Sequence, residues 1–250
     1  MAADKVMVVT GGGRGIGAAT ALLAAERGFA VSVNFLKDKD SASSLIDKIK
    51  SKNGRAIAVQ GDVSSESDVE RLFEETDRKL GRITALVNNA GIVDRGTRVE
   101  LMTAARIARM FAINVTGSFL CAREAVKRMS TRHGGAGGAI VNVSSIAAKL
   151  GGPGEYVDYA ASKGAIDTFT IGLSKEVGAE GIRINAVRPG IIRTEIHASS
   201  GDPARLERIG ATAPLGRPGE AEEVARTILW LLSDEASYLS GALVDVSGGR

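Results

Sequence analysis

The stretch Lys5-Val-Met-Val-Val-Thr10, continued by Gly11-Gly-Gly-Arg-Gly15-Ile-Gly17, decides the fold. The first six residues form an apolar, β-branched run, which predicts a strand buried on both faces. Gly11 permits a tight turn, Gly15 lets a phosphate approach backbone N–H groups at a helix N-terminus, and Gly17 lets a helix pack closely on the strand. An Ala/Leu-rich helix to Arg27 follows. This order favours a site for the phosphates of a dinucleotide over a glycine turn without a ligand.

Strand and helix patterns alternate through the rest of the chain. Further short apolar runs, each bounded by turn residues, predict strands at 30–35, 56–59, 83–87, 140–143, 182–187 and 243–246. Helical patterns end near Lys52 and Leu80 and span 103–111, 114–132, 157–177 and 221–232. Such alternation predicts a single α/β domain over 1–250, with a doubly wound parallel sheet and helices on both faces.

Composition narrows the function. Hydrophobic residues make up 44% of the 250-residue chain, enough for a full core, and the formal net charge is only +3. The basic residues are scattered, so neither nucleic acid nor a membrane surface is an expected partner. A single cysteine, Cys121, excludes an internal disulfide and is interpreted as core packing. With no signal peptide or 18-residue apolar run in view, we expect a cytoplasmic protein.

A second stretch carries the chemistry. The apolar run Ile140-Val-Asn-Val ends in Ser144 and Ser145, and the helix after the next glycine-rich turn contains Tyr159-Ala-Ala-Ser-Lys163. Residues four apart share one helix face, so the Lys163 ammonium is expected to lower the pKa of Tyr159 and make the phenol a better acid. Ser145 could then hold the substrate oxygen. The alternative is a tyrosine and a lysine that meet on a wet face by chance.

The end of the second strand bears on cofactor choice. A site for NAD usually places Asp or Glu there, on the ribose 2′-OH. This chain has Asn34, with Lys37 close behind and Arg14 inside the glycine turn. A carboxylate would repel a 2′-phosphate, whereas Arg and Asn can bind it, so the pattern favours NADP over NAD. Lys37 could also be an ordinary solvated lysine.

Polar residues follow two more strands. Asp62 could accept a hydrogen bond from an adenine amino group or could cap the next helix. Asn88 and Asn89 precede Gly91 and are expected both to fix the loop and to line a cofactor crevice. Asn114 lies in a helical stretch that should be apolar, where a buried structural amide is the other interpretation.

Taken together, Thr10-Gly11-x-x-x-Gly15-x-Gly17, Asn88-Asn-Ala-Gly91, Asn114, Ser145, Tyr159-x-x-x-Lys163 and Pro189-Gly190 make the chain resemble the short-chain dehydrogenases/reductases over essentially its whole length. It is most similar to bacterial members such as 3-oxoacyl-carrier-protein reductases and glucose dehydrogenases. The resemblance implies a seven-stranded Rossmann sheet and hydride transfer between a nicotinamide and a carbonyl or secondary alcohol.

The resemblance also assigns roles. It implies that Ser145 holds the substrate oxygen, Tyr159 is the acid/base, Lys163 binds the nicotinamide ribose and acidifies Tyr159, and Asn114 holds a water in a proton relay. No metal is implied. The cofactor-binding candidates are Gly11, Arg14, Gly15, Ile16, Gly17, Asn34, Lys37, Asp62, Val63, Asn88, Ala90, Gly91, Tyr159, Lys163, Pro189, Gly190, Ile192 and Thr194.

The spacing of the catalytic motif departs from the commonest family pattern. Ser145 and Tyr159 are one residue further apart than is commonest in the family. A second tyrosine, Tyr156, lacks a lysine four residues on, so Tyr159 is the better candidate for the acid. A catalytically silent dinucleotide sensor is the competing function, although it would have no use for the four catalytic residues together.

Weak periodicity at about 193–216, including Ile196 and His197, predicts a mobile substrate lid. Apolar helices 116–129 and 157–177, with a second surface around Trp230, predict a homotetramer.

Overall fold

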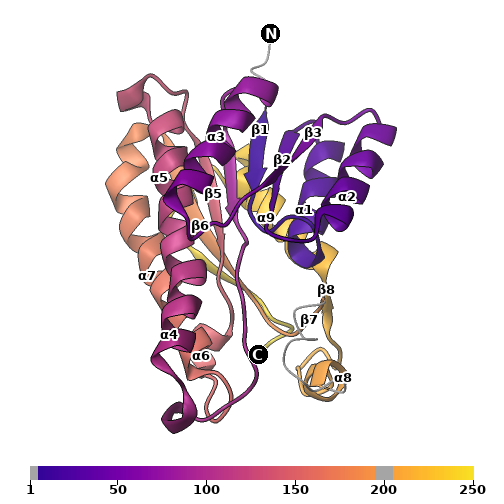
Figure 1. Ribbon diagram of the computed structural model, residues 1–250, viewed down its shortest axis with the longest axis vertical. Helices are drawn as coiled ribbons and strands as arrows, with labels where there is room; N and C mark the ends of the chain where they lie inside the picture. The colour runs from indigo at the N-terminus through magenta and orange to yellow at the C-terminus, as the bar shows by residue number, and fades with distance from the viewer. Residues whose placement is uncertain (1–4, 195–204) are drawn as a thin grey trace.

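The computed structural model describes residues 5–194 and 205–250. Within these ranges the centre of the molecule is one parallel sheet of seven strands in the order β3-β2-β1-β4-β5-β6-β9 (Figure 1). The strands are β1 (Val6–Val9), β2 (Ala30–Phe35), β3 (Ala56–Gln60), β4 (Ala85–Asn88), β5 (Gly138–Val143), β6 (Ile182–Pro189) and β9 (Leu243–Val246). The predicted doubly wound sheet is confirmed. The strand order reverses between β1 and β4, where ligands bind in such sheets.

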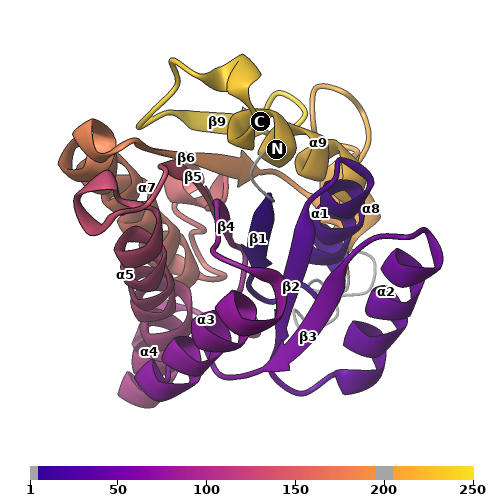
Figure 2. The ribbon, with the colours of Figure 1, turned by 90° about the horizontal axis from the view of Figure 1, so that it is seen from above.

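Helices cover both faces of the sheet (Figure 2). One face carries α1 (Gly15–Glu26), α2 (Lys39–Ser51) and α9 (Ala221–Leu232), and the other carries α3 (Glu66–Leu80), α5 (Gly117–Met129) and α7 (Val157–Val177). Each layer has its own apolar core, because strands buried on both faces send alternate side chains to opposite sides. Phe73 anchors one of these cores and Met7 the other, and both are fully buried.

Several further elements gather at the carboxyl ends of the strands, at the lower end of Figure 1. They include α4 (Ala104–Phe111), α6 (Ala147–Leu150), α8 (Arg205–Gly210) and the short pair β7 (Ile192–Arg193) and β8 (Gly219–Glu220). Single helical turns complete the chain at Val99–Leu101, Thr131–His133, Gly178–Glu180 and Asp234–Ala236. Loops that follow parallel strands all leave at this edge, so residues distant in sequence meet there.

One predicted helix differs in detail. The pattern predicted a continuous helix over 114–132, but α4 runs into a π-helical segment, Ala112–Thr116, before α5 begins. A π segment contains one extra residue in a turn, and it commonly marks a functional site. Asn114 lies at its centre and is fully buried.

Part of the predicted lid can be placed. Thr194 and the stretch from α8 to Gly216 are described, whereas Ile196 and His197 lie outside the described residues. Among the helices of ranges 5–194 and 205–250, none has the length and apolar character needed to cross a membrane.

Candidate active site

The glycine turn joins β1 to α1 as predicted. Gly11 has φ +58°, and a Cβ there would lie 2.9 Å from the Cα of Ala90. A Cβ on Gly17 would lie 2.6 Å from Asn89 Nδ2, so only glycine lets α1 approach this closely. The N-cap residue Arg14 makes no side-chain capping bond, which leaves the first N–H groups of α1 for a ligand.

Four hydrogen bonds hold this turn to the residues that follow β4. Asn89 Nδ2 donates to the backbone oxygens of Thr10 and Gly11, at 2.9 and 3.0 Å. In return, the Thr10 hydroxyl accepts from the backbone N–H groups of Asn89 and Ala90, each at 3.0 Å. Asn89 therefore fixes the loop geometry expected of the asparagine pair, and it also lines the cavity described next.

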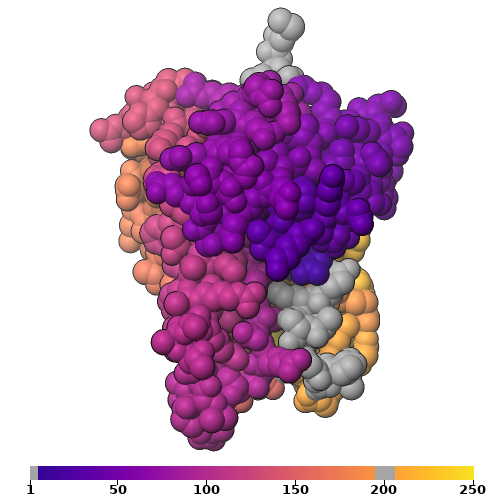
Figure 3. Space-filling view, viewed as in Figure 1, coloured from indigo at the N-terminus to yellow at the C-terminus, as the bar shows by residue number. Residues whose placement is uncertain are grey.

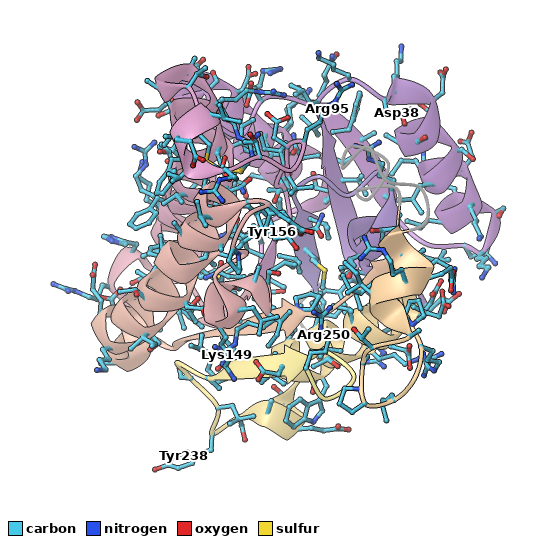
Figure 4. All side chains as sticks on the ribbon, turned by 90° about the horizontal axis from the view of Figure 1, so that it is seen from below. Asp38, Arg95, Lys149, Tyr156, Tyr238 and Arg250 are labelled. Atoms are coloured by element: carbon cyan, nitrogen blue, oxygen red, sulfur yellow. The ribbon has the colours of Figure 1, made fainter. Side chains whose placement is uncertain are left out.

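A cavity of about 600 Å³ runs across the carboxyl edge of the sheet. Most candidate cofactor residues line it: Gly11, Arg14, Gly15, Ile16, Asn34, Lys37, Asp62, Val63, Ala90, Gly91, Tyr159, Lys163, Pro189, Gly190, Ile192 and Thr194. In Figure 3 the magenta residues around α4 and the orange residues around α8 stand on two sides of this end of the molecule. Figure 4, seen from below, places Asp38 beside α2 and Tyr156 and Arg250 nearer the middle of the view.

Three candidates do not line the cavity. Gly17 acts through helix packing, as predicted. Asn88 is a correction: its amide points into the core, where Nδ2 donates to Asn142 Oδ1 at 3.0 Å and to the Ser118 carbonyl at 3.2 Å. A strand alternates its side chains between faces, and this register directs Asn88 inward. Asn114 lies behind the cavity wall.

The end of the cavity near α2 contains the cationic groups that the sequence singled out. Arg14 and Lys37 line it from the glycine turn and from the loop after β2. Asn34 has a different role from the one predicted: its Oδ1 accepts from Gly11 N at 3.3 Å and its Nδ2 donates to Gly61 O at 2.9 Å. Both ends of this buried amide are thus committed to the fold. The charge that could bind a 2′-phosphate therefore lies on Arg14 and Lys37.

Of the two interpretations of Asp62, the structure excludes the cap of the next helix. Its Oδ1 accepts from the backbone N–H and the hydroxyl of Ser64, at 2.9 and 2.7 Å, while Ser65 caps α3. Asp62 therefore shapes the turn into the helix rather than capping the helix itself, and it still lines the cavity.

Ser145, Tyr159 and Lys163 line the same cavity. The Ser145 hydroxyl lies in hydrogen-bond contact with the Tyr159 phenol. Lys163 Nζ donates to the Val143 carbonyl at 2.7 Å and lies 5.7 Å from the centroid of the Tyr159 ring. The serine thus comes from the loop after β5 and the other two from the first turns of α7, as the sequence predicted.

The electrostatics of this trio differ from the expectation. Burial raises the pKa of Tyr159 to about 12, and the hydrogen bond with Ser145 opposes this only in part. Burial also lowers the pKa of Lys163 to about 8, against the attraction of the Asp167 carboxylate. Loss of water disfavours the charged form of each group, and this effect exceeds the help that the ammonium was expected to give the phenol.

The π segment places the Asn114 side chain near Gly91 and Lys163, outside the lining of the cavity. Its Oδ1 accepts from Ile92 N at 2.8 Å and its Nδ2 donates to Ile92 O and Ser162 Oγ, each at 3.0 Å. A Cβ on Gly91 would lie 3.3 Å from Asn114 Oδ1 and 3.4 Å from Lys163 Nζ. The amide and the ammonium therefore approach one small region beside the Asn-Ala-Gly turn.

Sequence reasoning missed an ion pair that supports Tyr159. Arg106 Nε contacts Asp158 Oδ2 at 2.7 Å, with the aspartate side chain only 2% exposed, and Arg106 also donates to the Arg95 carbonyl at 2.7 Å. The guanidinium holds the pKa of Asp158 below its usual value despite the opposing effect of burial. Asp158 directly precedes Tyr159, so the pair fixes the start of α7. No spacing signal linked these residues, because they lie on different helices.

The sequence resembles known oxidoreductases over nearly its full length. Residues 11–250 match a family model described as enoyl-(acyl carrier protein) reductase. An uncharacterized oxidoreductase of Escherichia coli, YgfF, is 55% identical over 245 residues, covering 98% of this chain and 99% of that protein. A 3-oxoacyl-[acyl-carrier-protein] reductase of a Synechocystis species is 38% identical over 246 residues, covering 98% and 96%.

Solved structures of oxidoreductases are also similar to this chain. A short-chain dehydrogenase from Burkholderia cenocepacia in complex with NADP superposes with a TM-score of 0.90 at 29% identity, covering 98% of this chain and 97% of that one. A blue fluorescent protein from a metagenomic library, in complex with NADPH, gives the same score and coverage at 33% identity.

Proposed function

The chain belongs to the short-chain dehydrogenase/reductase family, and from that premise we propose that it is an NADP(H)-preferring oxidoreductase that interconverts a carbonyl and a secondary alcohol. The observation that carries the proposal is the meeting of Ser145, Tyr159 and Lys163 in one cavity with the glycine turn. A dinucleotide sensor would need the turn but not the trio.

The residues fit a nicotinamide dinucleotide. The uncapped N-terminus of α1 would hold the diphosphate, and Lys163 would hold the nicotinamide ribose. The Pro189–Thr194 segment would cover the carboxamide. A bound NADPH would supply the hydride, two electrons and one proton, to the carbonyl carbon and leave as NADP⁺.

The proton comes from the protein. Ser145 would donate a hydrogen bond to the carbonyl oxygen, and Tyr159 would transfer its phenolic proton to that oxygen as the C–O double bond becomes single. The resulting phenolate is stabilised by the nearby Lys163 ammonium and regains a proton from solvent, with Asn114 proposed to hold a water in that path. In the reverse direction the phenolate removes the proton of the alcohol.

Arg14 is proposed to select NADP(H). Replacing Arg14 by Gln is expected to raise the KM for NADPH by about 10- to 100-fold, because a charge-assisted bond to the 2′-phosphate is lost. The KM for NADH should change by less than about twofold. Initial rates with both cofactors provide the measurement, with Arg27→Gln, exposed at the other end of α1, as control. Equal effects on the two cofactors would move selection to another residue.

The activity itself is tested in both directions: NADPH oxidation is measured with simple ketones and 3-oxoacyl esters, and NADP⁺ reduction with sugars in lactol form. Turnover of any member supports an enzyme. Binding of NADPH, measured by fluorescence, without turnover of any member would favour the sensor.

The cytoplasmic location stays a prediction.

A homotetramer is proposed from two exposed apolar surfaces. The ring of Phe119 on α5, 47% exposed, stacks on Phe169 of α7 with centroids 3.8 Å apart, and Ile171 of α7 is 38% exposed. At the other surface Trp230 is 38% exposed. Two self-complementary patches generate D₂ symmetry. Light scattering at micromolar concentration should give a mass near four chains; a mass near one would refute the proposal, and a mass near two would leave one surface.

A further inference from the structure

The guanidinium of Arg106 on α4 joins three segments beside the candidate active site. Its Nε donates to Asp158 Oδ2 at 2.7 Å and its Nη2 donates to Asp158 Oδ1 at 3.3 Å. Its Nη1 donates to the carbonyl of Arg95, in the loop between β4 and α4, at 2.7 Å. The side chains of Arg106 and Asp158 are only 13% and 2% exposed. A forked, almost buried ion pair is stronger and more directional than an exposed one, so it fixes α4, the loop and the start of α7 together.

The same contact reaches the backbone of Tyr159. Asp158 Oδ1, which faces the guanidinium, also accepts from the Tyr159 N–H at 2.9 Å. On the other side, the Tyr159 carbonyl accepts from the Ser162 hydroxyl at 2.7 Å, and that hydroxyl accepts from Asn114 Nδ2 at 3.0 Å. Arg106 belongs to α4, and Asn114 belongs to the π-helical segment that continues it. One helical unit, residues 104–116, therefore holds the first turn of α7 on both sides of Tyr159.

The loop that Arg106 holds forms part of the cavity wall. Ile92 and Val93, at the start of this loop, line the cavity. Further along the loop, Thr97 N donates to the carbonyl of Glu155, just before α7, at 2.7 Å. Loss of the guanidinium would therefore loosen the cavity wall and the first turn of α7 at the same time.

The proposed reaction depends on where the Tyr159 oxygen lies. The phenol is in hydrogen-bond contact with Ser145, and its proton must pass to the substrate oxygen over a hydrogen-bond distance. A misplacement of about 1 Å can lower a rate about 100-fold. Because the phenol oxygen lies at the far end of its side chain, a small rotation of the first turn of α7 moves that oxygen further than it moves the backbone. The contacts that hold this turn therefore bear directly on proton transfer.

We propose that Arg106 is a positioning residue for the reaction: through Asp158 it holds the first turn of α7, so that the Tyr159 phenol stays against Ser145. Arg106 does not line the cavity and would touch neither cofactor nor substrate. This inference rests on the proposed function, because it concerns the geometry of the same site. A purely structural ion pair would support only the folded state. Loss of a positioning residue should instead lower kcat in protein that is still folded and still binds NADPH.

The first variant is Arg106→Met, which keeps an unbranched side chain without the guanidinium fork. Its kcat for NADPH oxidation should fall about 10- to 100-fold, whereas the KM for NADPH should change by less than about threefold. Arg106→Lys, which keeps a positive charge beside Asp158, should have a kcat between those of Arg106→Met and the wild type. Arg98→Met, which removes a 72% exposed arginine paired with Glu100 just before α4, is the matched control and should keep the wild-type kcat.

Two further comparisons separate positioning from stability. Arg106→Met leaves the Asp158 carboxylate buried without its partner and should lower Tm. Adding Asp158→Asn removes the unpaired charge and should restore most of that Tm, but kcat should stay low because the forked link between α4 and α7 is still absent. The second comparison uses Tyr159→Phe. If Arg106 acts through the phenol, adding Arg106→Met to Tyr159→Phe should lower the residual kcat by less than about twofold.

Hydrogen–deuterium exchange gives a readout without turnover. Peptides that span residues 156–163 should exchange faster in Arg106→Met than in the wild type, and at the wild-type rate in Arg98→Met. Unchanged exchange in Arg106→Met, or a wild-type kcat in that variant, would overturn the inference and leave the proposed function standing. A full further loss of kcat in the Tyr159→Phe background, or a kcat that recovers together with Tm, would make the pair structural and also refute the inference. If the wild type itself reduces no carbonyl, the proposed function fails and the inference fails with it.

Discussion

Replacing Tyr159 by Phe is expected to lower kcat by at least about 100-fold, the usual contribution of a positioned general acid. The ring and its edge-on contact with Tyr156, 5.8 Å between centroids, would remain, so the shape of the cavity should survive. Only the phenolic proton and its hydrogen bond with Ser145 are lost. The measurement is steady-state NADPH oxidation, together with NADPH binding by fluorescence, which should change by less than about threefold.

Tyr156→Phe is the matched control. It removes a hydroxyl from the other tyrosine of the same cavity wall, but Ala160 stands where Tyr159 has its lysine. The loss of kcat should be far smaller than that of Tyr159→Phe. Near-normal turnover in Tyr159→Phe would remove Tyr159 from the mechanism, and a larger loss in Tyr156→Phe would make Tyr156 the acid.

Replacing Lys163 by Met is expected to lower kcat/KM for reduction by about 100-fold or more, because a buried positive charge that stabilises the developing phenolate is removed. The pH dependence of kcat/KM in the wild type also tests whether the positive charge of Lys163 is needed. With the pKa of Lys163 lowered to about 8, its ammonium is present below that pH and lost above it. Tyr159, with its pKa raised to about 12, stays protonated throughout this window.

Reductive kcat/KM of the wild type should therefore be level below about pH 8 and fall above it. In Lys163→Met the rate should be low at every pH and the break should vanish. Lys149→Met, which breaks an exposed pair with Asp245, serves as the control and should retain both rate and break. A wild-type profile that stays level to pH 10 would show that the charge of Lys163 is not needed for reduction.

The sequence by itself determined the seven strands of the sheet and the main helices between them, in their order. Glycine spacing, apolar runs and caps act within a few residues, so the strand–turn–helix at Gly11–Gly17 and the bounds of α7 could be predicted from local pattern alone. Parallel strands also end at one edge, which is why Ser145, Tyr159 and Lys163 could be expected together from the sequence.

Only the tertiary structure decided how individual polar groups are used. Asn34 and Asn88 have the residue type of cofactor ligands, but packing turns their amides to Gly61 and Asn142. Burial raises the pKa of Tyr159, although the neighbouring Lys163 had suggested the opposite direction. Arg106 reaches Asp158 only because α4 lies beside α7, an arrangement of segments far apart in sequence. Burial and long-range contact depend on the whole fold, and no local spacing records them.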